Sequence, residues 1–208
     1  TGEKGYEIYV RDAHENAEKM WNAVLEAGEE FGLMVIAPAH HRRIAAGILS
    51  WGQDLDHETS PFQVNLSYQV PRNKAADYIG KEELEKQRAM MDEGKAPFKM
   101  KMVGLTLGGK EITDYAPDFW IVTNTDGDEV GYVTSPWWSP ELETNIALAW
   151  VPWEASEVGT KYMVKLPDEY AESPGVAVNA EIVDVPFRES VNPNKREVQA
   201  AKGLDFAD

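Results

Sequence analysis

The stretch "DFWIVTNTDGDEVGYVTS", residues 118–135, decides the fold of the larger part of this chain. Asp126 and Gly127 lie between two apolar runs, and an Asp-Gly pair in that setting is a strong signal for a β-hairpin turn. The stretch therefore predicts two antiparallel strands joined by a tight turn.

Four more short apolar runs lie on either side of this hairpin. They are "KMKMVGLTL" (99–107), "NIALAWVP" (145–152), "KYMVKL" (161–166) and "VAVNAEIVDVPF" (176–187). Several short strands at this spacing are typical of a small antiparallel barrel or sandwich. The pattern begins near Pro97, so we expect a domain boundary between residues 93 and 98.

The part before this boundary alternates between strand-like and helix-like segments, which indicates an α/β arrangement. The pattern predicts strands at residues 6–10, 33–38 and 63–70 and helices over residues 12–32 and 39–48. Residues 76–97 are expected to start with a turn and then to form a short charged helix that ends near Gly94. The chain is therefore expected to be α+β overall, with a partial α/β region followed by a β-rich region.

The charge of the chain limits its partners. It has 208 residues with 36 acidic against 20 basic side chains, a formal net charge of −16. Such a charge repels phosphate backbones and anionic membrane surfaces. No stretch is apolar for the roughly 18 residues that span a bilayer. We expect no nucleic-acid partner and no membrane association.

The residue types also limit the chemistry. The chain has no cysteine, so disulfides, thiolate metal sites and thiol catalysis are excluded. His40 and His41 are adjacent and have no further ligand at a metal-binding spacing, so we expect no metal. The lack of cysteine is compatible with an intracellular compartment, and we expect a cytoplasmic protein.

Trp137 and Trp138 lie between two prolines in "TSPWWSPE", residues 134–141, which we interpret as a loop. Large apolar rings are rarely left exposed there. The two rings either pack against other parts of the protein or line a cleft for a flat ligand, and the sequence leaves both alternatives open.

Four segments, in order, resemble the folate-dependent aminomethyltransferase family, which includes the T-protein of glycine cleavage and the dimethylsulfoniopropionate demethylases. "TGEKGYEIYV" (1–10) is similar to Y-T-G-E-x-G-[FY]-E-I, and "DYIGKEEL" (77–84) to F-I-G-[KR]-x-A-L. "RRIAAGILSWGQDLDHETSPFQVNL" (42–66) is similar to R-x-E-x-G-x-x-x-Y-G-x-[DE]-[ILM]-[DT]-x-x-x-[ST]-P. "GYVTSPWWSPELETNIALAWVP" (131–152) is similar to G-x-[IV]-T-S-G-x-x-S-P-x-L-x-x-x-I-A-L-A-x-V.

The resemblance implies a domain organisation. Residues 1–95 would be the C-terminal part of the folate-binding domain, residues 98–187 a small antiparallel β-barrel, and residues 188–208 a surface tail. Family members are about twice as long, and their catalytic aspartate lies in a part that would precede Thr1. The resemblance therefore implies an incomplete enzyme whose partner is a missing N-terminal half or a companion chain.

The resemblance also implies a tetrahydrofolate site. Glu7 matches the family glutamate that accepts hydrogen bonds from the pterin ring, and a carboxylate can accept two such bonds side by side. Tyr6 is expected beside it. Arg43 matches the motif arginine, which either steadies the folate tail or pairs with an internal acid, and we favour the internal role. Trp51 stands where the family usually has tyrosine.

The implied activity is the transfer of a one-carbon group from a small-molecule donor to tetrahydrofolate, as in one-carbon metabolism. Ala39 and His40 stand where the T-protein has a further arginine, and the segment is closer in outline to the demethylase branch. We therefore expect a methyltransferase acting on a sulfonium, quaternary ammonium or methylamine donor. The alternatives are the aminomethyltransferase of glycine cleavage and a non-catalytic folate-binding module of a dimethylglycine or sarcosine oxidising enzyme.

Overall fold

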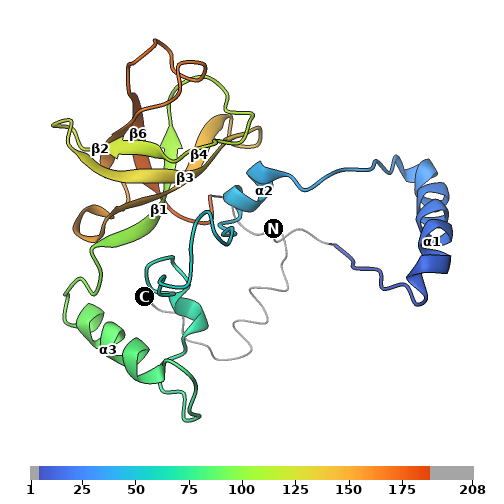
Figure 1. The fold of residues 1–208 in the computed structure, drawn as a ribbon, viewed down its shortest axis with the longest axis horizontal. Coiled ribbons are helices and arrows are strands. Elements are labelled where there is room, and N and C mark those ends of the chain that lie inside the picture. The colour runs from blue at the N-terminus through green and yellow to red at the C-terminus, as the bar shows by residue number, and fades with distance from the viewer. Residues whose placement is uncertain (1–4, 188–208) are drawn as a thin grey trace. The chain divides into compact units, whose positions relative to one another are not determined.

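The computed structural model of the chain describes residues 5–187 (Figure 1). Thr1 and the predicted surface tail at residues 188–208 lie outside the described residues. By its internal contacts the chain divides into a small unit, Glu3–Ala39, and a larger unit that contains the chain from His40 onward.

Six strands of the larger unit close into an antiparallel β-barrel (Figure 1). They are β1 (Met100–Leu107), β2 (Trp120–Thr123), β3 (Glu129–Ser139), β4 (Thr144–Pro152), β5 (Lys161–Val164) and β6 (Val178–Val183). The order around the barrel is β1-β4-β3-β2-β5-β6. The predicted α+β fold with a small antiparallel barrel is confirmed.

The hairpin of β2 and β3 forms where the Asp-Gly signal predicts it, with Trp120 opposite Val133. The side-chain oxygen of Asn124 accepts hydrogen bonds from the backbone N–H groups of Asp126 and Asp128, at 3.0 and 2.9 Å. Gly127 adopts a φ of 92°, which only glycine tolerates at low cost. The turn is therefore specified by local chemistry.

Strand β4 has apolar residues on both of its faces, because it separates two hydrophobic cores. Its small residues, such as Ala147 and Ala149, belong to the cluster inside the barrel. Its larger residues Ile146, Leu148 and Trp150 alternate with them and belong to a second cluster. Successive side chains on a strand point to opposite faces, so one strand supports both cores.

The second cluster joins the outside of the barrel to the segment that precedes it. Ile44 and Ala45 of α2 (His40–Ala45) are buried in it together with Val64. Helix α3 (Lys81–Asp92) and the short 3-10 helices η2 (Ser67–Gln69) and η3 (Trp153–Ala155) complete the larger unit.

Residues 63–70, predicted as a strand, form turns and the helix η2 instead. Asn65 has a φ of 60°, a left-handed conformation that a strand does not accommodate. The backbone N–H of Met102 donates to the carbonyl of Gln63 at 2.8 Å, which holds this segment against β1. The alternating apolar residues thus reflect packing on the barrel and not a ladder of strand pairs.

In the small unit, α1 (Ala13–Gly28) and η1 (Glu29–Phe31) occur where a helix is predicted. The strands predicted at residues 6–10 and 33–38 do not form, and both segments are irregular. A strand exists only when another strand satisfies its backbone hydrogen bonds. These segments have the apolar patterns of strands, but among the described residues no strand pairs with them.

Helix α2 ends in a Schellman motif that depends on Gly47. The N–H of Ile48 donates to the carbonyl of Arg43, and the N–H of Gly47 to that of Ile44, both at 2.8 Å. Gly47 has a φ of 68°, and a Cβ atom added there would lie 2.5 Å from Cγ1 of Val185. Both the backbone conformation and the packing therefore require glycine.

We predict that Gly47→Ala lowers the free energy of unfolding of the barrel unit by about 2 kcal/mol or more, from left-handed strain plus overpacking. Thermal and denaturant unfolding measure this loss. Gly94→Ala is the matched control, since Gly94 follows α3 at a φ of 72° and an added Cβ would meet nothing within 4 Å. An equal loss in the two variants would show that the contact with Val185 is unimportant.

Candidate functional site

Glu7 and Tyr6 lie in the extended segment at the start of the small unit, and both are exposed. The hydroxyl of Tyr9 donates to Oε2 of Glu7 at 2.5 Å, and this hydrogen bond raises the pKa of Tyr9. The other carboxylate oxygen of Glu7 has no hydrogen-bond partner among the described residues. The segment presents a carboxylate between two tyrosine rings.

Arg43, by contrast, is mostly buried in the larger unit, with 16% of its side chain exposed. Six polar atoms lie within hydrogen-bonding distance of its guanidinium: the two ring nitrogens of His40, only one of which can accept, the carbonyl of Ile48, Oε1 of Gln53, Oδ2 of Asp54 and Oγ of Ser135. The shortest contacts are 2.7 Å to Ser135 and 2.8 Å to Asp54. A guanidinium has five N–H groups, so the described residues can occupy all of them.

Asp54 is the acid that balances this charge, and only 1% of its surface is exposed. Its Oδ2 accepts from Arg43 and from the backbone N–H of Ser50 at 2.7 Å, and its Oδ1 accepts from the hydroxyls of Thr134 and Ser135, both at 2.6 Å. A buried carboxylate is tolerated only when it is paired and hydrogen-bonded. We call Arg43, Asp54, His40, Thr134 and Ser135 the Arg43 network.

A bulge in β3 allows two consecutive residues to reach the same carboxylate. Neighbouring side chains on a regular strand point to opposite faces, but the pairing of β3 with β4 shifts register between Val133 and Ser135. Bulges redirect side chains in this way. Both Thr134 and Ser135 therefore donate to Asp54.

His40 forms the buried side of the Arg43 network. Burial is the main cause that lowers its pKa to about 4, the nearby Arg43 charge adds to the effect, and Asp54 opposes it. The ring nitrogens lie 3.0 and 3.3 Å from guanidinium nitrogens of Arg43. A neutral imidazole can accept from the guanidinium at one nitrogen, whereas an imidazolium can only repel it.

Trp137 and Trp138 lie in β3 and not in the predicted loop, opposite Ile146 and Asn145 of β4. Trp137 packs against the second apolar cluster. Its ring centroid lies 5.1 Å from that of His40 and 5.5 Å from that of Tyr115. For Trp137, the structure thus shows a packing role beside the Arg43 network.

Trp51 has a different environment, with 61% of its surface exposed. Its ring packs at a steep angle against that of His57, with centroids 4.8 Å apart. It follows Ser50, whose backbone N–H is held by Asp54. The Arg43 network therefore anchors the loop that presents this exposed ring.

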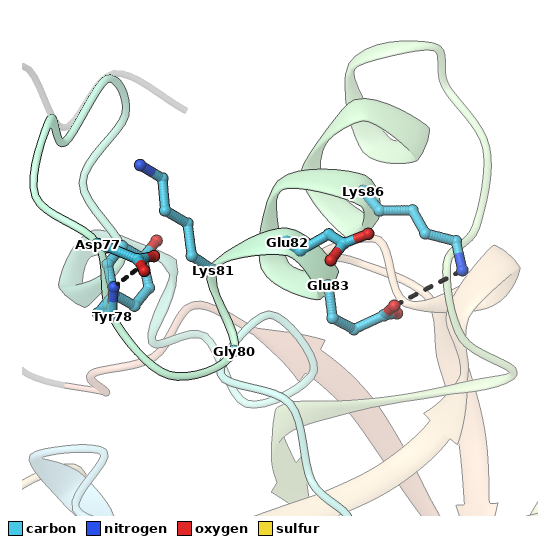
Figure 2. A pocket seen from close by; sticks show the side chains of 7 residues that line it. All are labelled: Asp77, Tyr78, Gly80, Lys81, Glu82, Glu83 and Lys86. Atoms are coloured by element: carbon cyan, nitrogen blue, oxygen red, sulfur yellow. Dashed lines mark hydrogen bonds and ion pairs between the residues drawn. The ribbon is translucent and has the colours of Figure 1, made fainter.

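A polar hollow of about 610 Å³ lies at the start of α3 (Figure 2). Figure 2 shows acidic and basic side chains side by side, with Lys86 paired to Glu83 at 3.6 Å. The hollow thus presents mixed charge to solvent, and none of the predicted site residues lines it. Nothing in it selects one kind of ligand.

The described residues 5–187 contain no group of three or more His, Cys, Asp or Glu side chains placed to hold a metal ion. None of their helices has the length and apolar character needed to cross a membrane.

The sequence alone gives no role to Asp54, Thr134 or Ser135. Signals for them existed, because Asp54 lies in the second quoted segment and the other two in the fourth. Local patterns could not show that these segments meet, since 80 residues separate Asp54 from Thr134. The structure brings Arg43 of α2 together with Asp54 of the following loop, and Trp51 lies on that same loop, next to Ser50.

Two models of known domain families match parts of the chain. A model described as the GCVT N-terminal domain matches residues 1–74, and one described as the glycine cleavage T-protein C-terminal barrel domain matches residues 101–188. The second match covers the barrel from the second residue of β1 to the end of β6.

Curated relatives named aminomethyltransferase share about a third of their residues with this chain. One from Geobacillus sp. is 34% identical over 189 residues, which is 90% of this chain and 47% of the relative. One from Clostridium botulinum (strain Kyoto) is 34% identical over 80% of this chain and 42% of the relative. The chain thus spans about half the length of the curated relatives it matches.

A solved structure is similar as well, the glycine cleavage system aminomethyltransferase T from Bartonella henselae. The TM-score is 0.56 with 25% sequence identity, over 73% of this chain and 38% of that one.

We predict that Asp54→Asn destabilises the barrel unit by about 3 kcal/mol or more, because it leaves the enclosed Arg43 without its counter-charge. Unfolding by denaturant measures the loss. Asp92→Asn is the control. Asp92 pairs with Arg72 at the same 2.8 Å, but both side chains are about half exposed, and exposed ion pairs contribute little to stability. Comparable losses in both variants would contradict a dominant role for the buried pair.

We also predict that acid destabilises the barrel unit through His40. The pKa of His40 is about 4 in the folded chain against an ordinary value of 6.5, so the unfolded chain binds the proton more readily between these values. Stability is therefore full above pH 6.5 and falls as the pH drops toward 4. Between pH 7 and 4.5 the wild type should lose about 1 to 2 kcal/mol more than His40→Gln.

The measurement is denaturant unfolding at several pH values. His57→Gln, which changes an exposed histidine, should retain the pH dependence of the wild type. The prediction is wrong if His40→Gln retains it too.

Proposed function

We propose that this chain, which belongs to the glycine cleavage T-protein family over residues 1–74 and 101–188, forms part of an enzyme that transfers a one-carbon group to tetrahydrofolate. The relatives of this family that match the chain carry the name aminomethyltransferase. Since the chain spans 47% of the first of them, the activity is proposed for the whole protein to which these residues belong.

The observation that carries this proposal is the meeting of two family segments in one place. Arg43 and Asp54 come from the second segment and Ser135 from the fourth, and they join in a buried charge network. A chance similarity of short motifs gives no reason for these polar residues to be buried together. Their contacts support a shared architecture.

The residues of the small unit suit a pterin ring. Glu7 offers one carboxylate oxygen without a partner among the described residues and a second that holds Tyr9. Together these oxygens can accept from the N–H groups of an amino-pyrimidinone edge. The exposed rings of Tyr6 and Tyr9 can stack on a flat heterocycle. We therefore assign Glu7 and Tyr6 to cofactor binding.

We assign Arg43 a positioning role, because its N–H groups already meet acceptors within the chain. It supports the loop that carries Trp51, whose exposed ring is available to a ligand. Bound tetrahydrofolate would supply the nitrogen that accepts the one-carbon group. The residues of this chain would bind and orient it, and we assign the catalytic group to a part of the protein outside this chain.

The donor we propose is a methyl group on a sulfonium, quaternary ammonium or methylamine compound. This rests on position 40, where the T-protein pattern has a cationic side chain and this chain has a neutral, buried His40. The aminomethyl group of glycine cleavage is the second candidate, favoured by the names of the relatives. We also propose a cytoplasmic location, in keeping with a chain that has no cysteine.

We predict that Glu7→Gln, in the whole protein, weakens tetrahydrofolate binding by about 10- to 100-fold, because charge-assisted hydrogen bonds contribute roughly 1.5 to 3 kcal/mol. Calorimetric titration with tetrahydrofolate measures the affinity. Assays of one-carbon transfer with a sulfonium, a trimethylammonium and an aminomethyl donor identify the substrate in the same preparation.

Glu18→Gln is the control. Glu18 is exposed on α1, and its substitution removes the same charge from the same unit. It should bind tetrahydrofolate as the parent does. The assignment of Glu7 to the pterin ring is wrong if Glu7→Gln binds tetrahydrofolate as tightly as the parent. The proposed one-carbon transfer is wrong if none of the donors is turned over.

A further inference from the structure

A second hollow, of about 330 Å³, lies between the loop at residues 70–78 and helix α3. This volume is at the lower end of the range for small-molecule sites. None of the site residues predicted from the sequence lines the hollow, which we call the Arg88 pocket. The charged side chains that line it are Arg72, Lys74, Glu85, Arg88 and Asp92.

Hydrogen bonds join the two walls of the Arg88 pocket. Arg88 of α3 donates to the backbone carbonyl of Val70, and Arg72 of the loop donates to both carboxylate oxygens of Asp92, each at 2.8 Å. The loop and the helix are therefore tied at two points by the chain's own contacts. A pocket that is formed in advance binds a ligand at a lower cost in conformational entropy.

Both acidic side chains of the pocket already have basic partners. Asp92 is paired with Arg72, and a carboxylate oxygen of Glu85 lies 3.9 Å from Nζ of Lys81. Arg88 and Lys74, by contrast, form no ion pair with a carboxylate of residues 5–187. The pocket thus has two cations whose counter-charge the described part of the chain does not supply.

Aromatic rings orient both of these cations. The guanidinium carbon of Arg88 lies 4.8 Å from the centroid of the Phe62 ring, and only 2% of Phe62 is exposed. Nζ of Lys74 lies 4.8 Å from the centroid of the Tyr78 ring. Such contacts attract a cation to the face of the ring. They restrict where the two charged groups can lie.

Most of the hydrogen-bonding capacity of Arg88 remains unused within the described residues. A guanidinium has five N–H groups, and the contact with Val70 is the one hydrogen bond that Arg88 makes to a described residue. Burial lowers the pKa of Arg88, the charge of Arg72 lowers it further, and Asp92 and Tyr78 oppose the shift. The surroundings thus disfavour the charged form of Arg88, and a bound anion would stabilise it.

We propose that the Arg88 pocket binds the carboxylate group of a small organic acid. The guanidinium of Arg88 donates to the two carboxylate oxygens, and the ammonium of Lys74 adds a second positive charge. The aliphatic part of the acid lies against the apolar side chains that line the pocket, which are Val70, Pro71, Leu84 and Ala89. The inference does not rest on the proposed function, because the residues of the proposed cofactor site do not line this pocket.

The walls of the pocket favour an organic carboxylate over a phosphate. A guanidinium can bind either group through two parallel N–H contacts, but an inorganic phosphate has no apolar part to lie against the aliphatic walls. Glu85 and Asp92 line the same pocket and repel a doubly charged group more strongly than a singly charged one. The formal net charge of −16 opposes polyanions at longer range.

The test is a calorimetric titration of the whole protein with butyrate, which has one carboxylate on a short aliphatic chain. Butyrate should bind at least about 10-fold more tightly than butyramide, its neutral isostere, because the amide lacks the charge-assisted hydrogen bonds. Butyrate should also bind more tightly than inorganic phosphate. At ten times its dissociation constant, butyrate should slow hydrogen exchange at residues 72–78 by about 10-fold.

Arg88→Gln should weaken butyrate binding by about 10- to 100-fold. Arg88 also ties the loop to α3, so Lys74→Gln is a second variant that leaves the contact with Val70 intact, and it should weaken binding by about 3- to 10-fold. Lys86→Gln is the matched control. Lys86 lies on α3 with 69% of its side chain exposed and does not line the pocket, so this variant should bind butyrate as the parent does.

The proposal is overturned if butyrate does not bind, if butyramide binds as tightly, or if inorganic phosphate binds more tightly. It is also overturned if Arg88→Gln and Lys74→Gln both bind butyrate like the parent. These readouts do not depend on turnover or on tetrahydrofolate. The carboxylate site and the proposed one-carbon transfer can therefore fail separately.

Discussion

The buried pair of Arg43 and Asp54 is the interaction on which the arrangement of the larger unit depends. A carboxylate in the interior needs a donor at each lone-pair direction, and Asp54 has Arg43, Ser50, Thr134 and Ser135. These donors come from three places in the chain: α2, the loop that follows it, and β3. Satisfying one charge therefore fixes the end of α2, the following loop and the bulge in β3 with respect to one another.

The same pair explains why the apolar contacts around it can form. With the polar groups satisfied, Ile44 and Ala45 can be buried against Leu148 and Trp150 on the outside of the barrel. The indole N–H of Trp150 donates to the backbone carbonyl of Asp54 at 3.0 Å. Polar and apolar packing are thus combined at one junction, and neither is complete without the other.

The two units differ in whether their backbone hydrogen-bonding groups and apolar faces have partners within the unit. The barrel closes on itself, so every strand has two neighbours and no edge remains. The small unit has a helix with an apolar face and extended segments with open backbone groups. This difference is why the strands predicted for the barrel form, whereas those predicted at residues 6–10 and 33–38 do not, although both parts have suitable residues.

Much of the barrel could be predicted from the sequence, because its signals are local. Asn124, Asp126 and Gly127 define the β-turn by their own hydrogen bonds and φ values. The strand predicted at residues 63–70 and the loop predicted around Trp137 were wrong for a common reason. An alternating or proline-flanked pattern shows which residues are buried, but not whether a neighbouring strand is there to pair with them.

At the candidate site, too, the sequence identifies single residues and the structure shows which of them are in contact. The family motifs pointed to Glu7, Arg43 and Trp51 one at a time, and local reasoning left two roles open for Arg43. The tertiary contacts show that its guanidinium is occupied by Asp54, Ser135 and His40, which supports the positioning role. The cofactor contact of Glu7 stays a prediction.

The amino-acid sequence by itself determined the hairpin turn, the positions of most barrel strands, the strong negative charge and the resemblance to a folate-dependent family. These follow from residue type and short-range spacing. Only the tertiary structure decided which polar residues share the interior and that Thr134 and Ser135 both reach Asp54. Those contacts join residues about 80 positions apart. They offset the free-energy cost of removing a charge from water, which no local pattern records.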